Sequence, residues 1–173
     1  VGSEMCIRDR IMKRLEGRGV MTVVDATKDL LVKVLKYHPF LVKPNNHELG
    51  EIFGVELKTR EDVVPYGKKL QEMGAENVLI SMAGEGAVLI AANGQVYKKP
   101  VPTGTLVNGV GAGDSMVAGF MAGWMEKRDY RHAFYMGIAA GSASAFSENL
   151  ATGKEVEAVY RQVAGQKQEG ENI

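Results

Sequence analysis

The chain has 173 residues, of which 45% are hydrophobic, enough for a domain with a substantial core. Its 21 Lys and Arg residues balance its 21 Asp and Glu residues, and this net charge of zero argues against binding to nucleic acid or to an acidic membrane surface. No apolar run approaches the length of a membrane span. The single cysteine, Cys6, excludes an internal disulfide and a cysteine-based zinc site, and it fits a reducing compartment such as the cytoplasm.

The chain begins with ten residues that have neither an initiator Met at their head nor the apolar stretch of a signal peptide, so we expect residues 1–10 to be a non-native leader. A regular pattern follows them. It predicts the end of a helix at 11–16, a buried strand at 20–24, a helix at 29–37 and a strand at 40–42. Two strands joined by a helix form a crossover unit, which implies that the strands are parallel.

The middle of the chain continues the alternation of helices and strands. A short helix is predicted at 46–53, and Thr59 with Asp62 indicates a capping box that opens a helix reaching Met73. Asn77–Ser81 reads as a third core strand, and the Asn93-Gly94 pair between two apolar segments is typical of a β-hairpin.

The last third is predicted to be helical, with one helix directly after a glycine-rich loop and two more at about 131–147 and 155–164. Together these elements predict one α/β domain over 11–165, with a mostly parallel sheet and an antiparallel hairpin at its edge. The polar tail at 166–173 is expected to be flexible.

The glycine-rich loop Val107–Ser115 is the most informative segment because it runs directly into a helix. Small residues let backbone N–H groups crowd around an anion, and the positive end of a helix dipole favours negative charge there. Asp114 is unexpected at such a place, since a carboxylate repels a phosphate. Either it caps the helix, as Asp often does, or it removes a proton from a hydroxyl that attacks a phosphoryl group. The residues alone leave these two roles about equally open.

Two better-known phosphate loops do not fit this segment. Gly104 and Gly109 have the spacing of a Walker A loop, but Val110 stands where that loop requires Lys. Gly109 and Gly111 could begin a dinucleotide fingerprint, but Asp114 occupies its last glycine position, which disfavours a Rossmann oxidoreductase.

Two helices near the loop have unusual composition. In the first, apolar residues at helical spacing predict one buried stripe, with small residues between them that allow neighbours to approach closely: Val117, Phe120, Met121 and Trp124. In the second, segment 138–145 consists almost entirely of small residues, among them Ser142. Such a face either admits the flat base of a nucleotide or packs closely on another helix, and the residues do not decide between the two.

Polar residues also follow two predicted strands, at the sheet edge where ligands of open α/β folds bind. Lys43 could neutralise a phosphate, and Asn45 and Glu48 could order a hydrated Mg²⁺; alternatively Asn45 is only a helix cap and Glu48 is solvated. The turn Ser81–Gly86 exposes N–H groups and a hydroxyl, as a nucleotide-contacting loop does, but an ordinary strand reversal has the same composition.

In combination these motifs resemble the ribokinase-like (PfkB) sugar kinases. Val110–Ser115 is similar to the second signature of that family, Lys43–Glu48 to its N-x-x-E element, and Ser81–Gly86 to its S-x-G-x-x-G nucleotide loop. The resemblance runs from about Ile11 to Val163. It implies a three-layer αβα, Rossmann-like ribokinase fold in truncated form. Within the family, segments 43–49 and 140–147 most resemble bacterial enzymes that phosphorylate fructose 1-phosphate with MgATP.

The resemblance also implies a role for each matching residue. Asp114 would be the general base, the amides of Gly111, Ala112 and Gly113 would form the anion hole, and Asn108 with Asp114 would contact the sugar phosphate, a phosphorylated ketohexose. Asn45 and Glu48 would hold Mg²⁺ through water. The expected ATP contacts are Lys43, Asn45, Ser81, Ala83, Gly84, Glu85, Gly86, Gly113 and Ser142.

Two departures from the family pattern limit these expectations. Ala83 stands where the nucleotide loop usually has its first Gly, and the family's N-terminal part, with its sugar-binding elements and small β lid, is missing. We therefore expect the 173 residues alone to be poorly active, and a homodimer of the parent protein to form through the lid. The alternatives are a tagatose-6-phosphate or 6-phosphofructokinase of the same family, or a non-catalytic nucleotide-binding module.

Overall fold

The computed structural model describes residues 2–165 of the chain. This part divides into two compact units. Unit 1 comprises the residues up to Met82 together with Val88–Val96. Unit 2 comprises Ala83–Ala87 and the residues from Tyr97 onward. None of the helices within 2–165 is long and apolar enough to cross a membrane.

Helices and strands alternate along the chain, as the sequence predicts. In order, the elements are α1 (Gly2–Leu15), β1 (Val23–Val24), α2 (Lys28–Val34), the 3-10 helix η1 (Leu35–Tyr37), β2 (Leu41–Val42), α3 (Asn46–Phe53), α4 (Arg60–Glu72), β3 (Asn77–Ser81), the 3-10 helix η2 (Ala83–Glu85), β4 (Ala87–Ile90), β5 (Val96–Lys99), α5 (Ala112–Lys127), α6 (Tyr130–Ala145) and α7 (Gly153–Gly165).

The five strands form one mixed sheet in the order β1-β2-β3-β4-β5. The first three strands are parallel, with Leu41 of β2 opposite both Val23 and Asn77. The predicted hairpin turn is also confirmed, since the Gly94 N–H donates to the Ala91 carbonyl at 3.0 Å and Gly94 has a φ of 83°. The predicted strand at 20–24 shrinks to two residues, because the chain is still exposed at Val20 and Met21 and pairs with β2 only after them.

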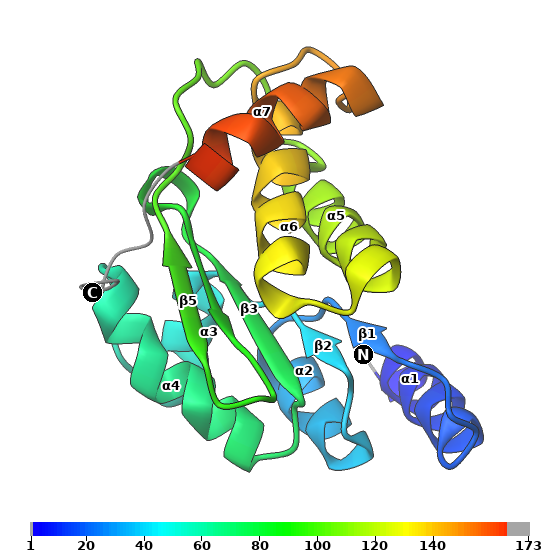
Figure 1. The fold of residues 1–173 in the computed structure, drawn as a ribbon. Coiled ribbons are helices and arrows are strands. Elements are labelled where there is room, and N and C mark those ends of the chain that lie inside the picture. The colour runs from blue at the N-terminus through cyan, green and yellow to red at the C-terminus, as the bar shows by residue number, and fades with distance from the viewer. Residues whose placement is uncertain (1, 166–173) are drawn as a thin grey trace. The chain divides into compact units, whose positions relative to one another are not determined.

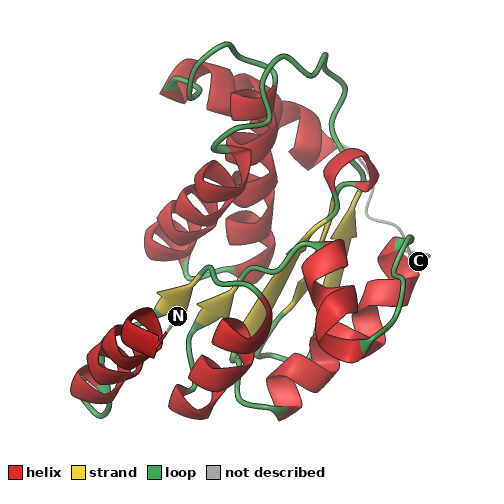
Figure 2. Cartoon of the chain, turned by 180° about the vertical axis from the view of Figure 1, so that it is seen from behind, coloured by secondary structure: helices red, strands yellow, loops and turns green. Residues whose placement is uncertain are grey.

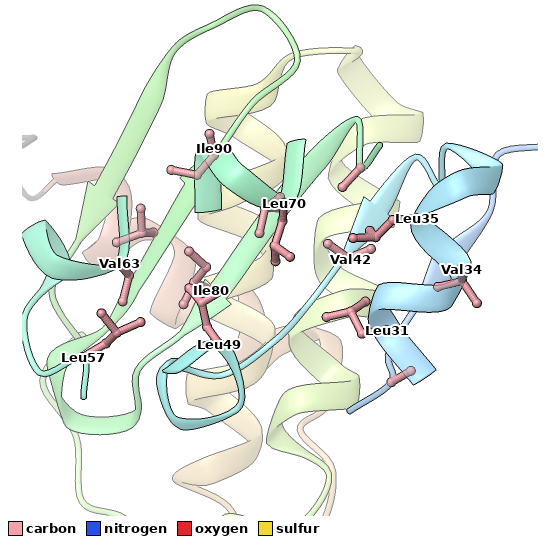
Figure 3. Packing of buried hydrophobic residues seen from close by; sticks show 14 of the residues in the cluster. Leu31, Val34, Leu35, Val42, Leu49, Leu57, Val63, Leu70, Ile80 and Ile90 are labelled. Atoms are coloured by element: carbon pink, nitrogen blue, oxygen red, sulfur yellow. The ribbon is translucent and has the colours of Figure 1, made fainter. Parts of the chain in front are cut away.

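The core of unit 1 lies between the sheet and helices α2, α3 and α4 (Figure 3). Seen from behind, these helices lie in front of the strands (Figure 2). Val78 and Ile80 of β3 point into this core, as do Leu49 of α3 and Leu70 of α4. Helix α4 comes unusually close to the sheet at Gly67, where a Cβ would lie 2.7 Å from the Ile90 side chain. Apolar side chains on one strand face thus hold three helices against it.

The opposite face of the strands is buried as well. Leu41, Leu79 and Leu89 alternate with the residues that face the core of unit 1, and each is fully buried. In unit 2, the Tyr97 ring of β5 packs against Phe134 of α6, with ring centroids 6.3 Å apart. Burial on both faces is what a sheet flanked by helices requires, and it explains why these strands are nearly continuous apolar runs.

In unit 2, helices α5 and α6 pack through backbone instead of through large side chains. A Cβ added to Gly119 would lie 2.5 Å from the Met136 carbonyl oxygen, and one added to Gly141 would lie 3.0 Å from the Ala112 carbonyl oxygen. Gly123 and Gly137 make similarly tight contacts. The two helices therefore lie side by side at a separation that only glycine permits (Figure 1).

This packing corrects the predicted stripe of α5. The buried residues are Met116, Gly119, Phe120 and Gly123, whereas Val117, Met121 and Trp124 are only half-buried. Hydropathy selects the large apolar residues, but the closest contacts of the helix are made by Gly119 and Gly123, which confirms the expectation that the small residues between them allow close approach.

His132 joins the three helices of unit 2. Its ring is nearly buried, with Nδ1 2.8 Å from the Tyr160 hydroxyl of α7 and Nε2 3.1 Å from Oε2 of Glu126 in α5. The hydrogen bond from His132 holds the pKa of the Glu126 carboxyl below its usual value.

The glycine contact makes a specific prediction about stability. Gly119→Ala should destabilise the protein by about 1–3 kcal/mol, because the new methyl group cannot fit between the helices, although alanine is the better helix former. Gly153→Ala is the matched control, since a Cβ there has open space and should be neutral or stabilising. Urea denaturation of both variants measures the difference. Equal stability of the two variants would refute the packing argument.

Candidate functional site

The glycine-rich loop of unit 2 ends at Gly111, which is the N-cap of α5 and has a φ of 78°. This left-handed conformation favours glycine, and a Cβ at Gly111 would also lie 2.9 Å from the Leu150 side chain. Helix α5 then begins at Ala112. The loop and the helix meet in the arrangement that the sequence predicts for an anion site.

Asp114 lies in the first turn of α5 and is exposed. The cap position belongs to Gly111, and no side chain caps this helix, so the reading of Asp114 as the N-cap is wrong. Within residues 2–165 the Asp114 carboxylate forms no hydrogen bond or ion pair. An exposed carboxylate without a partner, at the positive end of a helix, is available to a ligand.

The amides around Asp114 differ in availability. The Ala112 N–H donates to the Gly109 carbonyl at 3.3 Å, and the Ser115 N–H makes the first helical bond, to the Gly111 carbonyl at 2.9 Å. In the described chain the N–H groups of Gly113 and Asp114 have no hydrogen-bond partner, as the second and third residues of a helix usually do not. Of the expected anion-hole residues, Gly113 is thus the best placed and Ala112 is already engaged.

Asn108 fixes the start of the loop. Its side-chain oxygen accepts the Val110 N–H at 3.0 Å, and its amide nitrogen donates to the Glu148 carbonyl at 3.2 Å. The N–H groups of Val107 and Asn108 both donate to the carbonyl of Ala145, the last residue of α6. The expected contact of Asn108 with a sugar therefore competes with a structural role.

Ser142, expected to contact the nucleotide, is buried in α6. Segment 138–145 of this helix packs on α5 through Gly141, and Gly137 directly before it does the same, so the packing alternative holds for that face. No contact of Ser142 indicates a ligand, and its nucleotide role stays a prediction.

In unit 1 the candidate residues gather at the carboxyl ends of the strands, as predicted. Ser81 pairs with Asn45 in an isolated parallel bridge, and the Ser81 N–H donates to the Pro44 carbonyl at 3.2 Å. The ends of β2 and β3 are thus in direct contact.

Lys43 is nearly buried, and its ammonium lies 3.3 Å from Oδ2 of Asp25. Asp25 directly follows β1, and the sequence interpretation overlooked it; a carboxylate immediately after an apolar strand was the available signal. The ion pair joins the ends of β1 and β2, so a phosphate would have to share Lys43 with Asp25.

Asn45 and Glu48 form a reciprocal capping box at the start of α3. The Asn45 side chain accepts the Glu48 N–H, and Oε2 of Glu48 accepts the Asn45 N–H, each at 2.8 Å. The cap alternative for Asn45 is therefore correct, but Glu48 is tied to the backbone and only half-exposed. Within 2–165, no group of three or more His, Cys, Asp or Glu side chains could hold a metal ion directly.

The turn after β3 forms η2 in unit 2, and Ala83, Gly84 and Glu85 are exposed there. Ala83 has a φ of 46°, a left-handed conformation, at the position where the resemblance expects glycine. Gly86 also has a positive φ, and a Cβ there would lie 2.1 Å from the Lys99 carbonyl oxygen. The backbone shape typical of glycine is thus kept where the sequence has alanine.

Comparison with known proteins agrees with these features. Residues 10–157 match the pfkB family of carbohydrate kinases. The chain is 47% identical over 155 residues to 1-phosphofructokinase of Bacillus subtilis, covering 90% of this chain and 51% of that protein. It is 36% identical over 133 residues to D-tagatose-1-phosphate kinase of Bacillus licheniformis, covering 74% of this chain and 42% of that protein. The chain thus spans about half the length of these relatives.

A solved structure confirms the fold. Arabidopsis thaliana ribokinase, in complex with ribose and ATP, superposes with a TM-score of 0.79 over 91% of this chain and 53% of that one, at 20% sequence identity. The expected ribokinase-like fold, in part of its full length, is therefore correct.

The strained turn predicts an unusual effect of glycine. Ala83→Gly should leave stability unchanged or raise it by up to about 1 kcal/mol, because relief of the left-handed strain offsets the added chain entropy. Ala122→Gly, at an exposed position inside α5, should instead cost about 1 kcal/mol. Thermal unfolding of both variants measures the contrast, and a comparable loss in both would contradict the backbone assignment.

Proposed function

Because the chain belongs to the pfkB family of carbohydrate kinases, we propose that the full-length protein transfers a phosphoryl group from MgATP to the hydroxyl of a phosphorylated ketohexose. Fructose 1-phosphate, phosphorylated at its 6-hydroxyl to fructose 1,6-bisphosphate, is the first choice of substrate. The identity of 47% to a 1-phosphofructokinase supports this choice. Cytoplasmic location and a homodimeric full-length protein remain predictions.

Asp114 is the proposed general base, and its environment is the observation that carries the proposal. The carboxylate is exposed, it caps no helix, and it has no partner in the described chain. It can therefore accept a proton from the attacking sugar hydroxyl. A positioned base typically contributes about 10²–10⁴ in rate.

The N–H groups of Gly113 and Asp114 are the proposed donors to the transferring phosphoryl group. They face outward from the first turn of α5, where the helix dipole adds to their attraction for negative charge. Phosphoryl transfer depends mainly on such positioning and electrostatics, since the protein has little covalent chemistry to perform.

The carboxyl ends of the strands of unit 1 are proposed to bind MgATP. Asn45 and Glu48 supply oxygen atoms, the ligand type that Mg²⁺ prefers, but the capping box already engages the single side-chain oxygen of Asn45 and one of the two carboxylate oxygens of Glu48. A hydrated Mg²⁺ fits them better than direct ligation does, because this ion usually retains several waters. Bound Mg²⁺ would neutralise phosphate charge. Ser81 and the turn Ala83–Gly86 are proposed to contact the nucleotide.

Replacement of the base tests the mechanism. In the full-length protein, Asp114→Asn should lower kcat by at least about 10²-fold with little effect on ATP affinity, because the amide keeps the shape but cannot take the proton. Glu157→Gln on the exposed face of α7 is the charge-matched control and should retain full activity. A coupled kinetic assay measures kcat, and titration with ATP measures the affinity for ATP. Turnover of Asp114→Asn within tenfold of the parent would exclude Asp114 as the general base.

A substrate panel tests the choice of sugar. Fructose 1-phosphate should give the highest kcat/KM among fructose 1-phosphate, fructose 6-phosphate, tagatose 1-phosphate and tagatose 6-phosphate. The sequence relatives include kinases named for fructose and for tagatose phosphates, so tagatose phosphates are the main competitors. A higher kcat/KM for either tagatose phosphate would reassign the substrate while leaving the base in place.

A further inference from the structure

Ser144 lies in the last turn of α6, and its hydroxyl joins three segments of unit 2. It is 4% exposed. Its Oγ–H donates to Oγ of Ser115 in α5 at 2.9 Å, and its oxygen accepts the Ala151 N–H at 3.2 Å. A buried hydroxyl with both its donor and its acceptor engaged is costly to replace, because removal leaves its partners unsatisfied.

The residue that Ser144 holds is central to the candidate site. Ser115 directly follows Asp114, and its N–H makes the first helical hydrogen bond of α5, to the Gly111 carbonyl at 2.9 Å. The turn closed by this bond contains Ala112, Gly113 and Asp114. A displacement of Ser115 would therefore move the carboxylate and the two outward N–H groups together.

The close approach of the helices brings the two serines within reach. Gly141 lies one turn before Ser144 on the same side of α6, and a Cβ there would lie 3.0 Å from the Ala112 carbonyl oxygen. The close backbone contact thus reaches Ala112, the first residue of α5. The hydrogen bond between Ser144 and Ser115 lies one turn further along α6.

Both ends of the glycine-rich loop are tied to the same turn of α6. The start is held where the Val107 and Asn108 N–H groups donate to the Ala145 carbonyl, and the end is held through Ser115 and Ser144. The segment after α6 adds a further tie, because Ala151 bonds to Ser144 and the Glu148 carbonyl accepts from Asn108.

We propose that Ser144 is a positioning residue for phosphoryl transfer, acting through Ser115 to hold the first turn of α5 and Asp114 in place. The proposal rests on the proposed function. It assigns no ligand to Ser144, which is buried and bonded within the fold. Misplacement of a reacting group by about 1 Å can lower the rate by about 10²-fold, so a single hydrogen bond at this place has a measurable effect.

The test compares Ser144→Ala, Ser115→Ala and the double variant in the full-length protein. Each single variant should lower kcat by about tenfold to a hundredfold with little change in the KM for ATP. The double variant should lose no more than either single variant, because the two hydroxyls act through one bond. Ser147→Ala is the control. Its hydroxyl also lies at the end of α6, but it donates to Ala143 and Glu155 instead of to α5, so kcat should stay unchanged.

Three results would overturn the proposal: unchanged kcat in Ser144→Ala, losses that add in the double variant, or an equal loss in Ser147→Ala. Circular dichroism establishes that the variants fold. If Ser144→Ala does not fold, Ser115→Ala alone tests the proposal, because Ser115 is only half-buried. The proposal then requires kcat to fall in this variant. Asp114→Asn separates the two ideas. If Asp114→Asn is inactive while Ser144→Ala is as active as the parent, only the positioning role fails. If Asp114→Asn is also active, the proposed role of Asp114 as the base fails, and if the parent protein phosphorylates no sugar, the proposed function itself fails.

Discussion

The backbone contact between α5 and α6 is the constraint on which unit 2 depends. Gly119 and Gly141 permit it, since a Cβ at either position would meet a carbonyl oxygen of the facing helix at 3.0 Å or less. The contact places the last turn of α6 beside the first turn of α5. The glycine-rich loop is then tied to that turn at both ends, and this leaves Asp114 and two N–H groups facing outward.

The sequence predicted most of the fold because its local signals agree with the tertiary structure. The capping box at Thr59 and Asp62, the strand Asn77–Ser81 and the helix Asn46–Phe53 all occur where they were expected. The buried face of α5 was predicted only in part, since Phe120 is buried but Val117, Met121 and Trp124 are half-buried. Periodicity weighs apolar side chains, whereas the actual contact is made where side chains are missing, as at Gly123.

The candidate site was predicted less completely than the fold. Composition identified the loop and Asp114, but it could not decide whether Asp114 caps α5 or has a free carboxylate. The answer depends on which residue adopts the N-cap conformation, and in the structure this is Gly111. The pairing of Lys43 with Asp25 and of Ser144 with Ser115 joins residues far apart in the chain. Such pairs leave no periodic signal in a single sequence. The role of Asn45 was open for a different reason, because a helix cap and a polar ligand-binding residue have the same local sequence signal, and the structure shows the cap.

The double attachment of the glycine-rich loop has a consequence for the thermodynamics of binding. A loop held at Ala145 and Ser144 by its two ends has already lost much of its conformational entropy before any ligand arrives. Its outward N–H groups are therefore preorganised, and an anion that binds there need not order the backbone. If the proposed anion site is correct, its selectivity comes from fixed geometry instead of induced closure.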